Sequence, residues 1–226
     1  MGEAELQPNN DLLIIHAVIN FYGDAANDDL SVRIAKDIED FWNSAEGKAA
    51  ISDGWFSKKI YRVVFKIEGK LERELTPQIV FENTDPRNNY FRIEEYAIGN
   101  ISFVDGINSN TGYFKLENLL NNSTTAAHEF GHTIGLEHPH DMDIRGRGIP
   151  GIMYPRGTLV DPEFQYYPEV EPGEKGGTLN PFTRKVLQKD IDDLHLNDLD
   201  FNENGFAIIG DFTSMWHEKH LPGTDQ

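Results

Sequence analysis

The sequence of 226 residues predicts a single α+β domain. Its first half alternates strand and helix signals, whereas its second half begins with a helical stretch and then becomes a long region rich in Gly, Pro and Asp. We expect an N-terminal subdomain over residues 10–136 and an irregular C-terminal subdomain over residues 137–226, with an extra tail after residue 196.

The first half contains five candidate strands and one candidate helix. Residues 12–21 are an apolar run of strand length, and residues 60–67 alternate apolar and polar side chains. Shorter candidates are residues 78–82, 90–97 and 100–105. Between the first two strands, Ser31 can cap a helix whose apolar positions recur at three-to-four spacing as far as Trp42.

The second half starts with a predicted helix over residues 116–135. Another helix is predicted over residues 181–194, where Val186, Leu187 and Ile191 repeat at helical spacing. No run of apolar residues reaches the ~20 that a membrane span needs, so we expect none. The acidic start of the chain does not have the pattern of a signal peptide.

Charge and cysteine content exclude several classes of function. A formal charge of −18 opposes nucleic-acid binding, which needs a basic surface. The chain has no cysteine, so a metal ion would have to be bound through His, Asp, Glu or Tyr. Asp-rich segments at residues 190–200 and 198–203 make structural calcium a further candidate, with a solvated acidic loop as the alternative.

A candidate metal site begins in the first predicted helix of the second half. His128 and His132 are four residues apart, so on a helix both imidazoles can face one ion. Glu129 is offset by about 100°, which suits a base that contacts a metal-bound water rather than the ion. Ten residues of continuous helix would carry His138 about 15 Å away. Gly135 can end the helix and turn His138 back toward the site.

Three neutral imidazoles leave one position of tetrahedral zinc open, as in catalytic zinc sites. The residues His128, Glu129, His132, Gly135 and His138 would occur by chance at these offsets in about one chain of this length in 10⁵. Zinc would lower the pKa of its bound water toward ~7. Glu129 would take the proton from this water and pass it to the leaving amine.

The pattern His-Glu-x-x-His-x-x-Gly-x-x-His, followed by Met153, resembles the metzincin zinc proteases. Residues 128–138 are similar to the matrix metalloproteinases, and His138-Pro139 is similar to the serralysins. The resemblance implies a zinc-dependent endopeptidase that cleaves proteins or peptides. It also implies a twisted, mostly parallel five-stranded sheet with a backing helix and an active-site helix, then an irregular C-terminal subdomain with one helix.

The same resemblance implies roles for residues after the third histidine. Met153 would form a floor beneath the zinc ligands, and Asp190 would support the turn that carries Met153. Tyr154, Pro155 and Arg156 would line the primed side of the substrate pocket. An ordinary core methionine and a solvated helix aspartate are the alternatives for Met153 and Asp190.

We expect a monomer that is secreted or delivered to a target cell. Without cysteine the chain cannot use the cysteine switch of the matrix metalloproteinases, so a dedicated protein inhibitor is a candidate partner. An alternative function is the catalytic effector, or toxin, module of a larger secreted bacterial protein. A zinc-binding scaffold without catalysis is a weaker alternative, because it could dispense with Glu129. A calcium-binding module is also weaker, because the Asp-rich segments have neither EF-hand nor glycine-rich repeat spacing.

Overall fold

The computed structural model describes residues 1–52 and 57–223 and has an α+β fold, as predicted. Eight strands within these residues belong to one sheet. They are β1 (Gly2–Gln7), β2 (Leu12–Tyr22), β3 (Lys48–Ser52), β4 (Lys58–Leu71), β5 (Asn88–Glu94), β6 (Phe103–Val104), β7 (Thr111–Lys115) and β8 (Phe206–Ile209). The α-helices are α1 (Asp28–Asn43), α2 (Pro77–Phe81), α3 (Thr125–Thr133) and α4 (Gln188–Asp192).

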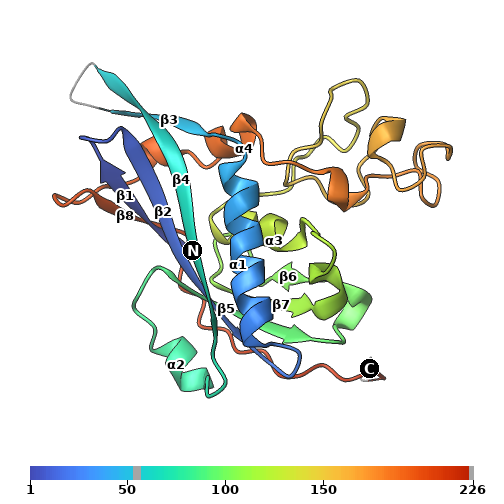
Figure 1. Cartoon of the computed structure of the whole chain (residues 1–226), viewed down its shortest axis with the longest axis horizontal. Helices are drawn as coiled ribbons and strands as arrows, with labels where there is room; N and C mark the ends of the chain where they lie inside the picture. Colours follow the sequence, from blue (N-terminus) through green and yellow to red (C-terminus); the bar gives the residue numbers. More distant parts are fainter. Residues whose placement is uncertain (53–56, 224–226) are drawn as a thin grey trace.

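The middle of the sheet is parallel and its margins are antiparallel. The strand order is β3-β4-β2-β5-β7-β6, in which β4, β2, β5 and β7 run in parallel. The outer strands β3 and β6 are antiparallel to their neighbours, and β1 pairs antiparallel with both β2 and β8. Figure 1 shows the twist of this sheet. The prediction of five strands was therefore too low.

The predicted strand at residues 78–82 was wrong, because these residues lie in and directly after α2. The Thr76 side chain accepts a hydrogen bond from the N–H of Ile79, and Pro77 occupies the first turn, which are both signals of a helix start. The predictions also lacked β1, β3, β7 and β8. In β7, residues on both faces are buried, so the alternation typical of a half-exposed strand is absent.

Helix α1 packs against the sheet and against α3 (Figure 1). Its cap is Asn27, whose side chain accepts from the N–H of Leu30, whereas the predicted cap Ser31 lies inside the helix. Near its end, the indole N–H of Trp42 donates to the Ala127 carbonyl at 3.1 Å, and the Trp42 ring lies edge-on to Phe130. These contacts fix α3 beneath α1.

After α3 the chain runs mainly as loops to one side of the sheet (Figure 1). The predicted helix at residues 181–194 is divided into a 3-10 helix at Pro181–Thr183 and the five-residue α4. The tail after residue 196 returns to the sheet, where β8 pairs with β1 and the His220 ring stacks on Tyr113 at 4.6 Å. None of the helices in the described residues is long and apolar enough to span a membrane.

Candidate metal centre

Helix α3 carries three of the predicted site residues and is shorter than the sequence predicted. The predicted helix over residues 116–135 is interrupted because Asn121 and Asn122 adopt positive φ angles of 59° and 57°. A 3-10 helix at Leu116–Leu119 precedes this break, and α3 begins at Thr125. All nine residues of α3 are buried, so its polar side chains must find partners inside the protein.

Gly135 lies two residues after Thr133, the last residue of α3, and its φ angle of 106° favours glycine. The N–H of Leu136 donates to the Gly131 carbonyl at 3.0 Å, and the N–H of Gly135 donates to the His132 carbonyl at 3.2 Å. This pattern is a Schellman-type helix end. It reverses the chain within three residues, so that His138 faces back toward α3.

The imidazoles of His128, His132 and His138 converge. The Nε2 atom of His138 lies 3.1 Å from Nε2 of His128 and 3.1 Å from Nε2 of His132. One ring nitrogen from each of the three lies within 4.8 Å of the others. His128 and His132 are buried and His138 is exposed, so the group is open on one side.

The second nitrogen of each buried histidine fixes its tautomer. Nδ1 of His128 lies 2.8 Å from the Ile152 carbonyl oxygen, and Nδ1 of His132 lies 2.7 Å from the Leu136 carbonyl oxygen. Because a carbonyl oxygen only accepts, each Nδ1 carries the proton and each Nε2 presents a lone pair. Burial lowers the pKa of His132 to about 4 and that of His128 well below its ordinary value, which keeps both rings neutral.

This donor set fits a metal ion and is compatible with zinc. Lone pairs that face one another repel unless a cation or a proton lies between them. Tetrahedral zinc with Zn–N bonds of about 2.0–2.1 Å places two ligand nitrogens about 3.3–3.4 Å apart, close to the spacing seen between these rings. Within residues 1–52 and 57–223 there is no second convergent group of three His, Asp or Glu ligands, so structural calcium has only the Asp-rich sequence in its support.

Glu129 is buried beside the histidines on α3. Burial raises the pKa of its carboxyl to about 8, although the positive charges of Arg184 and Arg156 and the N–H of Val104 act in the opposite direction. Val104 belongs to β6, so Glu129 lies next to the edge of the sheet. A cation held by the histidines would oppose this rise in pKa and favour the carboxylate form, which is the form that a base needs.

Comparisons with models of known protein families, with curated proteins and with solved structures found no match. The interpretation of the site therefore depends on the geometry of this chain. The decisive feature is the convergence of three imidazole lone pairs beside a buried carboxyl that belongs to α3.

Met153 packs against α3, and Asp190 contacts the backbone of the turn that carries Met153. A Cβ atom on Gly131 would lie 2.3 Å from the Met153 sulfur, so the methionine packs directly against α3 between the two helical histidines. The Asp190 carboxylate accepts from the Leu187 N–H at 2.7 Å and from the N–H of Ile152. Burial raises the Asp190 pKa to about 6. Asp190 thus lies behind the turn rather than in solvent.

Arg184 is a site residue that the sequence did not reveal. Its side chain is buried, and it donates to the Tyr154 carbonyl and to the Thr124 hydroxyl, each at 3.0 Å. Its Nη1 atom lies 2.9 Å from Nδ1 of His128, which donates to Ile152 instead. Burial lowers the Arg184 pKa to about 10. No local pattern marks one arginine in a loop, so only the three-dimensional contacts identify it.

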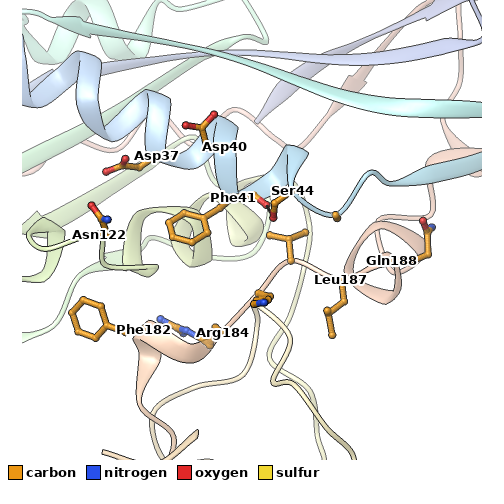
Figure 2. A pocket seen from close by; sticks show the side chains of 12 residues that line it. Asp37, Asp40, Phe41, Ser44, Asn122, Phe182, Arg184, Leu187 and Gln188 are labelled. Atoms are coloured by element: carbon orange, nitrogen blue, oxygen red, sulfur yellow. Dashed lines mark hydrogen bonds between the residues drawn. The ribbon is translucent and has the colours of Figure 1, made fainter.

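The three predicted pocket residues do not share one cavity. Tyr154 lines a cavity of about 800 Å³ together with His138 and Met153. Arg156 lines a different cavity, of about 540 Å³. Pro155 is half-buried and lines neither of these cavities. A third cavity, of about 670 Å³, lies between α1 and residues 182–188, where Figure 2 shows Arg184 beneath Phe41.

Proposed function

We propose that this protein is a zinc-dependent endopeptidase. The observation that carries the proposal is the convergence of His128, His132 and His138 beside the buried carboxyl of Glu129. Three histidines leave a position open, which distinguishes catalytic zinc sites from structural ones. Zinc bound there would supply Lewis-acid chemistry and an activated water.

The chain itself supplies proton transfer. Glu129 is the only carboxyl on α3, and it is buried beside the histidines. As a carboxylate it would take a proton from the attacking water, and as a carboxylic acid it would deliver that proton to the amine that leaves.

The edge of the sheet supports a peptide as the substrate. β6 is the last strand of the order, and Val104 in β6 lies close enough for its N–H to influence Glu129. Extended peptides commonly bind along an exposed sheet edge through main-chain hydrogen bonds. A peptide aligned with β6 would therefore run past the metal centre.

Cleavage of a peptide library by the zinc-loaded protein tests the proposal. We expect hydrolysis that stops when a chelator removes zinc and returns when zinc is restored. Glu129→Gln should retain zinc and lose about 10²–10⁴-fold in rate, because it keeps the size of the side chain and removes the base. Cleavage that persists in the chelator, or full activity of Glu129→Gln, would overturn the proposal.

A further inference from the structure

A polar cavity lies on the N-terminal side of α3 and has a volume of about 540 Å³. One wall comes from residues 115–123, which lead into α3, and the opposite wall from Arg156, Tyr166 and residues 181–182. The volume is sufficient for a side chain of a bound peptide. The cavity is separate from the one that contains His138 and Met153.

The cavity carries a net positive charge in a strongly acidic chain. Its cations are Lys115 and Arg156, and its only carboxylate is Glu117. Lys115 is already neutralised, because its amine lies 2.7 Å from the Glu117 carboxylate. Arg156 is exposed, and it makes no ion pair with any residue in the described part of the chain. The free charge in the cavity is therefore the guanidinium of Arg156.

Arg156 also connects the cavity to the metal centre. It follows Met153 by three residues in the same segment. Arg184 donates to the Tyr154 carbonyl in this segment at 3.0 Å, and its Nη1 atom lies 2.9 Å from Nδ1 of His128. The opposite wall is attached to the start of α3, since the Thr124 hydroxyl donates to the Pro181 carbonyl at 2.7 Å. Both groups of lining residues are thus attached to the metal centre, which places the cavity beside a peptide bound there.

We propose that the cavity binds an acidic side chain of the substrate and that Arg156 determines this specificity. The proposal rests on the function proposed above. A guanidinium presents a planar set of N–H donors that matches a carboxylate, and such charged hydrogen bonds are stronger than neutral ones. Tyr166 lines the same cavity, and its hydroxyl is a further donor.

Cleavage of matched peptides tests this specificity. Each set of peptides differs at one position, from two residues before to two residues after the scissile bond, and carries Glu, Gln or Lys there. For the native protein, we expect kcat/KM at one position to be about 10-fold or more higher for Glu than for Gln. Arg156→Gln should bring Glu and Gln close to parity, and Arg156→Glu should favour Lys at the same position.

Arg33→Glu is the matched control, because Arg33 is an exposed arginine on α1 outside the metal centre and the cavity. Both substitutions to Glu change the net charge equally, so a long-range effect would alter the two proteins alike. We expect Arg33→Glu to retain the native preference. Zinc content and circular dichroism verify that the Arg156 variants are folded.

The outcomes separate the two proposals. Chelator-sensitive cleavage without a preference for Glu, or a preference that survives in Arg156→Glu, would overturn the specificity and leave the peptidase function intact. A loss of preference in Arg33→Glu would also overturn the role of Arg156. Absence of chelator-sensitive cleavage from every peptide would overturn the peptidase function, and the specificity with it.

Discussion

The two halves of the chain build the metal centre in different ways. Residues 1–136 contain β1 to β7 and α1 to α3, whereas the described residues after 136 add little regular structure beyond α4, β8 and short 3-10 helices. Yet His128, Glu129 and His132 come from the regular half, and His138, Met153 and Arg184 from the irregular half. The site lies where the two halves meet.

Backbone hydrogen bonds and hydrophobic packing fix the regular half. In the irregular half, buried polar side chains take over part of this role, because loops leave carbonyl and N–H groups without partners. Arg184 donates to the Tyr154 carbonyl, and Asp190 accepts from the Leu187 N–H. Substitutions in the irregular half should therefore disturb the metal centre more selectively than they disturb the core.

The largest difference is expected between substitutions of the exposed His138 and of the buried His128. His138→Ala should weaken zinc binding by more than about 100-fold, beyond the 10–100-fold that loss of a supporting residue costs. It should hardly change the stability of the metal-free protein, because His138 is exposed. His128→Ala should lower both the zinc affinity and the stability of the metal-free protein, because it also removes the N–H that donates to the Ile152 carbonyl. Zinc competition and urea unfolding measure the two effects, and equal stability losses would contradict this contrast.

Gly131→Ala tests the packing of the methionine against α3. The added methyl group would overlap the Met153 sulfur, so we expect a loss of about 1–3 kcal/mol in the free energy of unfolding. Gly157→Ala is the control in the irregular half, because a Cβ atom there meets nothing within 4 Å. Its effect should stay within about 0.5 kcal/mol. Equal urea midpoints for Gly131→Ala and the native protein would show that Met153 does not pack against α3.

Arg184→Gln tests whether the loop after the third histidine depends on side-chain donors. The substitution removes the guanidinium that reaches Thr124 and Tyr154, and we expect zinc affinity to fall by about 10–100-fold. Arg145→Gln is the matched control, because Arg145 is exposed and paired only with its near neighbour Asp143 among the described residues. Similar zinc affinities of Arg184→Gln and Arg145→Gln would refute the positioning role of Arg184.

Asp190→Asn should produce the smallest effect, which is a change in how the free energy of unfolding depends on pH. The Asp190 pKa is raised from 3.8 to about 6 by burial, so the folded protein binds this proton more tightly than the unfolded chain. The resulting stabilisation is present at low pH and is lost as pH rises through about 6. Relative to Asp190→Asn, the native protein should lose about 1 kcal/mol of unfolding free energy between pH 5.5 and pH 7.5. A constant difference in urea unfolding across this range would contradict the prediction.

The sequence predicts elements best where one local pattern dominates. Residues 12–21 and 60–67 lie in β2 and β4, because apolar content and alternation agree there. The helix at 181–194 was predicted too long, since its apolar residues repeat at helical spacing although residues 184–187 are not helical. α2 was predictable in principle, because Thr76 and Pro77 are typical of a helix start. The short apolar run that follows them was instead interpreted as a strand.

For the metal centre, spacing places His128 and His132 on one face of a helix, and the structure brings His138 to them. The position of Arg184 could not be predicted, and neither could the hydrogen bond of 2.8 Å from the Asn108 N–H to the His132 carbonyl at the end of α3. Both depend on contacts between distant parts of the chain, which leave no pattern in the local sequence. The division of the predicted pocket residues between two cavities has the same cause.

A crystal structure of the zinc-loaded protein, with anomalous data collected at the zinc absorption edge, tests the central claim most directly. We predict one strong anomalous peak at about 2.0–2.1 Å from the Nε2 atoms of His128, His132 and His138. Its absence, or a peak that excludes His138, would contradict a centre built jointly by the regular and the irregular halves.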